Sequence, residues 1–160
     1  MTVLVLVGLP GSGKSTWAAA QPITVLSSDK IRQLLADDAT NQQIHQEVFR
    51  TLRFLLRRRL ELGAFATIID ATSLLPVHRK PFIKLAHSLG AHAEAVYFDT
   101  PLEECLRRNA TRSRVVPPEV IAALAAKLRP PTLAEGFTKI HRIPFPPLVA
   151  GVGNLGIKLA

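Results

Sequence analysis

Short runs of hydrophobic residues alternate along the chain with segments in which hydrophobic residues recur every three or four positions. The runs are typical of buried strands, and the three-to-four spacing is typical of helices. Strands are expected at 2–7, 23–26, 65–70, 91–99 and 137–143, and helices from about residue 14 and over 27–38, 44–63, 76–88, 101–108 and 118–127. This alternation predicts an α/β fold, with a parallel sheet of about five strands flanked by helices on both faces.

The pattern predicts one domain over residues 1–143. Residues 144–160 are rich in Pro and Gly and are expected to form an irregular tail. The apolar runs are too short to span a bilayer, so no membrane association is expected. The single cysteine, Cys105, fits a reducing compartment, which predicts a cytoplasmic protein. The five histidines lack metal-ligand spacing, so no structural zinc is expected.

The net charge changes this picture only in part. The chain has 20 Lys and Arg against 12 Asp and Glu, a formal charge of +8. A basic surface favours polyanionic partners such as nucleic acid, but it is equally consistent with simple solubility. The segment "RFLLRRRLELG" contributes Arg53, Arg57, Arg58 and Arg59, and such a run is typical of a solvated helix face.

The stretch "GLPGSGKST" follows the first expected strand and precedes a helix. It satisfies the spacing G-x-x-x-x-G-K-[ST], which is typical of a loop whose backbone N–H groups hold the phosphates of a nucleotide. Lys14 is expected to contact the outer phosphates, and the Ser15 hydroxyl to ligate Mg²⁺. The alternative is a glycine-rich turn without a ligand. The predicted nucleotide-binding residues are Gly8, Pro10, Gly11, Ser12, Gly13, Lys14, Ser15 and Thr16.

The segment "SSDKIR" directly follows the second expected strand, where Ser28 or Asp29 is expected to cap a helix. The carboxyl ends of parallel strands face one crevice, so this segment should border the bound phosphates. Asp29 could then accept a proton from an attacking hydroxyl, and Arg32 could hold an anionic group of the acceptor. The alternative makes Asp29 a helix cap and Arg32 a surface residue.

Two further features point to the same crevice. Asp70 ends the third expected strand, where it could act near Mg²⁺ or orient the acceptor, or simply cap the next loop. The segment "LRRNATRSR" supplies Arg107, Arg108, Arg112 and Arg114. Arg108 and Arg112 are four residues apart and could share a helical face, forming a lid that neutralises phosphate charge. A solvated basic turn is the alternative for this segment.

Together, "GLPGSGKST", "SSDKIR", "IIDATS", "RRNATR" and "EGFTKI" resemble the kinase module of bacterial RNA-repair polynucleotide kinases, relatives of the phage-type 5′-hydroxyl kinase. The resemblance covers roughly residues 2–140. It implies a P-loop kinase fold that transfers the γ-phosphate of ATP or another NTP, with Mg²⁺, to the 5′-OH of RNA or DNA.

The same resemblance implies a role for each matching residue. Asp29 would be the general base, and Arg32 would bind the phosphate 3′ to the attacking nucleoside. Arg108 and Arg112 would be lid residues that contact the ATP phosphates. Asp70 matches the acidic position of the motif D-A-T-N, in which Ser73 replaces the asparagine. Related repair proteins carry phosphatase or ligase modules that are not seen in this sequence. The chain is therefore expected to act alone, to act with separate phosphatase or ligase partners, or to serve another acceptor.

Two rival hypotheses stay open. The first is a kinase of the same fold that acts on a sugar, an antibiotic or a nucleoside. The second is a nucleotide-binding regulatory module without transfer activity, although such a module needs no base at the position of Asp29. The chain has no N-K-x-D guanine signature.

Overall fold

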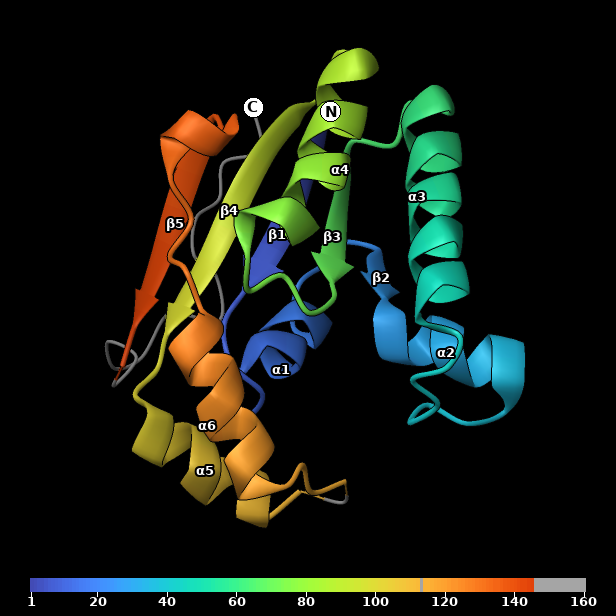
Figure 1. Ribbon diagram of the computed structural model, residues 1–160. Coiled ribbons are helices and arrows are strands. Elements are labelled where there is room, and N and C mark those ends of the chain that lie inside the picture. Colours follow the sequence, from blue (N-terminus) through green and yellow to red (C-terminus); the bar gives the residue numbers. More distant parts are fainter. Residues whose placement is uncertain (113, 146–160) are drawn as a thin grey trace.

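A computed structural model of the chain describes residues 1–112 and 114–145 (Figure 1). The strands are β1 (Thr2–Val7), β2 (Val25–Ser27), β3 (Ala66–Asp70), β4 (His92–Asp99) and β5 (Lys139–Pro144). The helices are α1 (Lys14–Ala19), α2 (Ser28–Ala36), α3 (His45–Glu61), α4 (Pro76–Ser88), α5 (Leu102–Ala110) and α6 (Pro118–Lys127), with a short 3₁₀ helix η1 at Leu133–Glu135.

The five strands form one sheet in the order β2-β3-β1-β4-β5. Every neighbouring pair is parallel. All the carboxyl ends therefore lie at the same edge of the sheet, at the bottom of Figure 1. The register pairs Ser27, the last residue of β2, with Asp70, the last residue of β3. The start of α2 is thus held next to the end of β3.

Alternate residues of the central strand pack against opposite layers, as strand geometry requires. Val3 and Val5 pack with hydrophobic residues of α3 and α4, including Leu52 and Phe82, and these two helices cover the front of the sheet in Figure 1. On the other face, Leu4 and Leu6 pack with Trp17 and Ala18 of α1. The α/β fold with a five-stranded parallel sheet is confirmed.

Two local predictions were wrong. The N-cap of α2 is Ser27, whose hydroxyl accepts a bond from the Lys30 backbone N–H at 3.5 Å, and neither Ser28 nor Asp29 is the cap. The register of β2 explains this, because Ser27 still has extended backbone and the helix begins at the next residue. Helix α5 ends at Ala110, so Arg112 lies beyond it and shares no helical face with Arg108.

The side chain of Asn109 explains the end of α5. Its amide donates to the carbonyl of Val116 at 2.7 Å, and its carbonyl accepts from the Val116 backbone N–H at 3.0 Å. The Thr111 hydroxyl also donates to the carbonyl of Arg108 at 3.0 Å. These contacts fold the chain back after the helix. The arginine-bearing segment between α5 and α6 therefore returns toward the body of the domain.

Arg79 is fully buried in α4 and forms a double ion pair with Glu135, at 2.7 Å for each N–O distance. It also donates to the backbone carbonyls of Ser73, Leu74 and Arg129. A buried charge is tolerated when it is paired and its donors are satisfied. Arg79 therefore ties the loop after β3 to η1 and to the segment before it.

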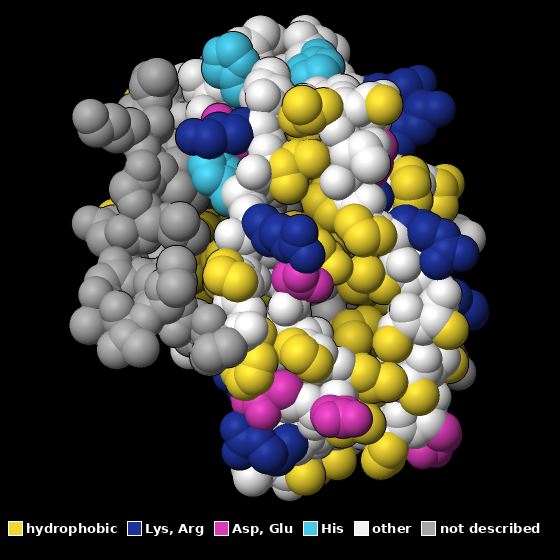
Figure 2. Space-filling view, turned by 90° about the vertical axis from the view of Figure 1, so that its left-hand side faces the viewer, with side chains coloured by type: hydrophobic (Ala, Val, Ile, Leu, Met, Phe, Trp, Pro, Cys, Tyr) yellow, Lys and Arg dark blue, Asp and Glu magenta, His cyan; other side chains and the backbone are white. Residues whose placement is uncertain are grey.

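The arginine run of α3 lies away from the carboxyl edge of the sheet. Helix α3 begins beside α2 and runs toward the opposite end of the strands (Figure 1). Near its C-terminus, Arg57 and Arg58 are paired with Glu61 at 3.8 and 2.7 Å. Figure 2 shows the face that carries β5, on which hydrophobic side chains run down the centre and basic side chains are scattered. That face is not a continuous basic surface.

Within the part of the chain that the structure describes, no helix combines the length and hydrophobicity needed to cross a membrane. The tail expected over residues 144–160 falls outside the described residues from residue 146 onward, and Pro144 belongs to β5.

Candidate active site

A cleft of about 1620 Å³ opens at the carboxyl edge of the sheet. Ligand pockets commonly measure about 300–1,000 Å³, so the cleft has room for more than one ligand. Of the predicted site residues, Pro10, Gly11, Ser12, Gly13, Lys14, Ser15, Thr16, Asp29, Arg32, Asp70, Arg108 and Arg112 all line it. Gly8 does not line the cleft, although its carbonyl binds the Lys14 side chain.

The conformation of the glycine-rich loop depends on Gly11 and Gly13. Both have positive φ angles, +83° and +98°, that residues with side chains rarely adopt. A Cβ at Gly11 would lie 2.4 Å from the carbonyl oxygen of Cys105, so the loop packs directly on the backbone of α5. Gly13 is the N-cap of α1, whose first residue is Lys14. The loop conformation is therefore set by the local sequence together with α5.

Lys14 turns its ammonium group back into this loop. Its Nζ donates to the carbonyls of Gly8 and Leu9 at 2.8 and 2.7 Å. Burial lowers the pKa of Lys14 from its ordinary value to about 8, and the neighbouring charge of Asp70 partly opposes that shift. A buried ammonium is stabilised by an anion, so the loop is suited to receive a phosphate.

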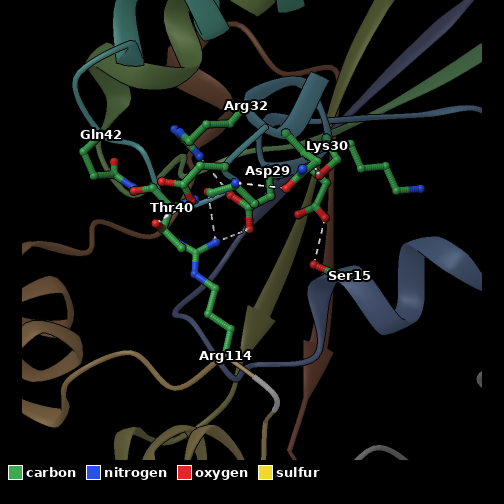
Figure 3. Close-up of polar contacts among 12 residues, drawn as sticks. Ser15, Asp29, Lys30, Arg32, Thr40, Gln42 and Arg114 are labelled. Carbon is green, nitrogen blue, oxygen red and sulfur yellow. Dashed lines mark hydrogen bonds and ion pairs between the residues drawn. The ribbon is translucent and has the colours of Figure 1, made fainter. Parts of the chain in front are cut away.

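Ser15 and Asp70 meet across the cleft from elements that are far apart in the sequence. The Ser15 hydroxyl, in the first turn of α1, donates to Oδ2 of Asp70 at 2.8 Å (Figure 3). The interpretation of Asp70 as a mere loop cap finds no support in this contact. Two oxygen ligands beside a phosphate loop are of the kind that Mg²⁺ prefers.

Asp29 and Arg32 form an ion pair in the lining of the same cleft. The distance from Arg32 Nη1 to Asp29 Oδ1 is 3.0 Å, and both side chains come from α2 (Figure 3). The Arg32 side chain is 5% exposed and that of Asp29 is 57% exposed. Arg32 is therefore not a surface residue, which corrects that alternative. Its Nε is buried without a hydrogen-bond partner, so the guanidinium is not saturated by the protein.

Arg108 and Arg112, the arginines predicted to form a lid, line the cleft from α5 and the segment after it. Arg108 Nη1 lies 3.5 Å from the position that a Cβ on Gly13 would occupy. Arg108 also pairs with Glu104 and stacks on the Phe145 ring, 5.2 Å from the ring centroid. The charge of Arg112 contributes to the lowered pKa of Lys14, which places it near the loop. Both residues reach the cleft.

The contact between Arg114 and Asp29 was not predicted from the sequence. Arg114 lines the cleft and its Nη1 lies 3.4 Å from Asp29 Oδ2. Arg114 belongs to the same basic segment as Arg108 and Arg112, and this was the feature of the sequence that could have indicated the contact.

Ser73 is 1% exposed, its hydroxyl has no hydrogen-bond partner, and it does not line the cleft. The replacement at Ser73 therefore lies behind the site wall.

Polar and aromatic residues that were not among the predicted site residues also line the cleft. They are Gln42, His45 and Phe49. The rings of His45 and Phe49 lie 4.5 Å apart between centroids. Five cationic residues of the lining outnumber two acidic ones: Lys14, Arg32, Arg108, Arg112 and Arg114 against Asp29 and Asp70. The cleft therefore favours anionic ligands.

A phosphate loop, an aspartate across the cleft and several arginines at the carboxyl edge of a parallel sheet define a P-loop protein of the kinase type. The AAA domain family model AAA_33 matches residues 3–131, and the chain belongs to that family. Its kinase relatives support phosphotransferase activity in general.

Two curated relatives are similar to the chain. The L-seryl-tRNA(Sec) kinase of Methanococcus maripaludis is 26% identical over 136 residues, covering 81% of this chain and 53% of that protein. The bifunctional polynucleotide phosphatase/kinase of Schizosaccharomyces pombe is 23% identical over 150 residues, covering 89% of this chain and 33% of that protein. The chain thus spans about half of the first relative and a third of the second.

Solved structures share the fold. A sugar kinase from Janibacter sp. HTCC2649 superposes with a TM-score of 0.63 and 19% identity, covering 89% of this chain and 85% of that one. The Pnkp1/Rnl/Hen1 complex gives a TM-score of 0.60 and 23% identity, covering 72% of this chain and 41% of that one. These likenesses confirm the α/β P-loop kinase fold.

Proposed function

We propose that this chain is an ATP-dependent kinase that transfers the γ-phosphate to the 5′-hydroxyl end of RNA or DNA. One observation carries the proposal: the Asp29–Arg32 pair lines the same cleft as the phosphate loop. A carboxylate in that place can take a proton, and an arginine beside it can hold a phosphate. A nucleotide-binding module that only switches needs neither group.

The acceptor class is inferred from charge and from the relatives. Arg32 is nearly buried yet keeps an unpartnered Nε, and three further arginines line the cleft. An acceptor that carries phosphate satisfies these donors better than a neutral one. The similarity to a polynucleotide phosphatase/kinase and to a kinase that is named for a tRNA substrate supports a nucleic-acid acceptor.

In the proposed reaction, the acceptor hydroxyl oxygen attacks the γ-phosphorus and the new oxygen–phosphorus bond forms. The bond from the γ-phosphorus to the β–γ bridging oxygen breaks, and ADP leaves. Asp29 receives the hydroxyl proton on a carboxylate oxygen. Lys14 holds the transferred phosphate, while Arg108 and Arg112 neutralise the charge that develops on its oxygens.

Mg²⁺ fits the residues on the loop side of the cleft. The Ser15 hydroxyl would ligate the ion and Asp70 would hold it directly or through water, since their oxygens already lie 2.8 Å apart. When bound there, Mg²⁺ would offset the negative charge of the phosphates.

A second candidate is a kinase for a small molecule. The specific observation in its favour is the sugar kinase fold, which this chain matches over 85% of the length of that protein. The arginine run of α3 does not argue against it, because Arg57 and Arg58 are already paired with Glu61 at the far end of the helix.

Labelling with ATP of three acceptors separates the candidates: a 5′-OH oligonucleotide, a nucleoside 3′-monophosphate and a free nucleoside. The proposal predicts efficiency in that order, with oligonucleotide affinity falling as salt rises through counterion release. Arg32→Ala should erase most of the advantage of the 3′-monophosphate, at about 1.5–3 kcal/mol for a charge-assisted hydrogen bond. Equal labelling of nucleoside and oligonucleotide, or efficient labelling of a sugar alone, would favour the small-molecule kinase.

A further inference from the structure

The two oxygens of the Asp29 carboxylate have different arginine partners. Oδ1 faces Arg32 Nη1 at 3.0 Å, and Oδ2 faces Arg114 Nη1 at 3.4 Å (Figure 3). Arg32 belongs to the same helix and is 5% exposed, whereas Arg114 comes from the segment between α5 and α6 and is 39% exposed. Burial holds Arg32 in place, whereas the more exposed Arg114 can exchange its contact with Asp29 for another one.

Arg114 also closes the acceptor side of the cleft. Its Nη1 donates to the carbonyl of Ala39 at 3.1 Å, in the loop between α2 and α3. Figure 3 shows its side chain reaching across from the segment after α5 toward both Asp29 and the loop that carries Thr40. A single side chain therefore joins the lid segment, the acceptor loop and Asp29.

This arrangement has a chemical consequence for transfer. A carboxylate oxygen that already accepts from a guanidinium has less capacity to accept a proton from a hydroxyl. The Asp29–Arg114 contact is long and half exposed, so it is a weak ion pair. An acceptor phosphate offers the arginine a stronger, bidentate partner. Exchange of Arg114 from Asp29 to that phosphate would leave Oδ2 free.

We propose that Arg114 is a specificity-determining residue that senses an anionic acceptor. Without an acceptor it occupies Oδ2 of Asp29, and with one it binds the phosphate next to the attacking nucleoside, which Arg32 contacts from the buried side. Transfer then selects phosphate-bearing acceptors. Water, which brings no anion, is a poor acceptor, so ATP is spared. This inference rests on the proposed function of the cleft.

The test compares the unchanged chain with Arg114→Ala, Arg114→Lys and the control Arg58→Ala. The control removes one exposed arginine, paired with Glu61 on α3, outside the cleft. Two quantities are measured: ADP release from ATP without acceptor, and the ratio of labelling of a nucleoside 3′-monophosphate to that of its free nucleoside. If Arg114→Ala does not fold, Arg114→Gln replaces it.

Arg114→Ala should lower the labelling ratio by about ten- to a hundredfold and raise ADP release without acceptor. Arg114→Lys, which keeps the charge and loses the bidentate geometry, should restore part of the ratio. Arg58→Ala should change neither quantity.

An unchanged ratio in Arg114→Ala, with the wild type still labelling the 3′-monophosphate, would overturn this inference and leave the proposed function standing. If the wild type labels no nucleoside, nucleotide or oligonucleotide, the proposed function fails instead. ADP release is then the remaining test of this inference. A rise in Arg114→Ala supports the view that the contact with Asp29 restrains ATP cleavage, and no rise overturns the inference.

Discussion

Two sides of the cleft are built in different ways: the side with the phosphate loop, here called the nucleotide side, and the side with Asp29, which we propose receives the acceptor and which is here called the acceptor side. The nucleotide side is built mainly from one continuous stretch, residues 8–16, which follows β1 and includes the first turn of α1, and its geometry depends on glycine conformations and a buried lysine. The acceptor side combines α2, the loop before α3 and the segment after α5. Its contact between Arg114 and Asp29 joins residues 85 positions apart.

This difference shows which parts of a site can be predicted from a sequence pattern. A phosphate loop keeps its spacing because consecutive N–H groups must point at one anion. The acceptor side has no such constraint on spacing, because its donors come from separate elements. Substitutions on the two sides should therefore have separable effects on nucleotide affinity and on transfer.

The largest effect is expected on the nucleotide side. Lys14→Ala removes the ammonium that contacts the loop carbonyls and, by the proposal, the transferred phosphate. ATP affinity should fall by about ten- to a hundredfold, and transfer by a further factor of about a hundred to a thousand. Titration calorimetry and single-turnover labelling measure the two losses. Unchanged ATP affinity would show that the phosphates bind elsewhere in the cleft.

Arg79→Met should destabilise the domain, because Arg79 ties the loop after β3 to η1 and to the segment before it. The change removes the charged partner of Glu135 and the donor to three backbone carbonyls. Removing one partner of a buried ion pair costs about 3–5 kcal/mol. Urea unfolding should show this loss.

Arg142→Met is the matched control for that loss. Arg142 pairs with Asp99 at the surface, where its side chain is 68% exposed. An exposed pair contributes about 0–1 kcal/mol, so little stability should be lost. Similar losses in Arg79→Met and Arg142→Met would contradict the structural role of Arg79.

A smaller effect is expected from Ser27→Ala, which removes the N-cap of α2. The hydrogen bond is long, 3.5 Å, so the loss should be about 0.5–1 kcal/mol. Thermal unfolding measures this loss. Unchanged stability in Ser27→Ala would contradict the assignment of Ser27 as the cap.

Hydrophobic periodicity predicted the fold, because strands and helices of a parallel α/β sheet bury their residues with different repeats. The phosphate loop was predicted from the spacing of its own residues, because consecutive backbone N–H groups must point at one anion. The carboxyl-edge rule also predicted that Asp29 and Asp70 would reach the cleft, and the register of Ser27 with Asp70 shows how they do so.

Other features could not be predicted because they depend on tertiary contacts. The segment "SSD" offers three capping residues in a row, and only the register of β2 selects Ser27. The helical face expected for Arg108 and Arg112 fails because Asn109 binds the backbone of Val116 and folds the chain back. The contact of Arg114 with Asp29 depends on that return of the chain.

The central claim is that Asp29 serves transfer and not nucleotide binding. ATP affinity and single-turnover transfer to a 5′-OH oligonucleotide, measured on the same preparation of Asp29→Asn, test it most directly. The account predicts that transfer falls by about a hundred- to ten-thousandfold, as for loss of a general base, while ATP affinity changes little. Retained transfer, or a loss of ATP affinity as large as the loss of transfer, would contradict it.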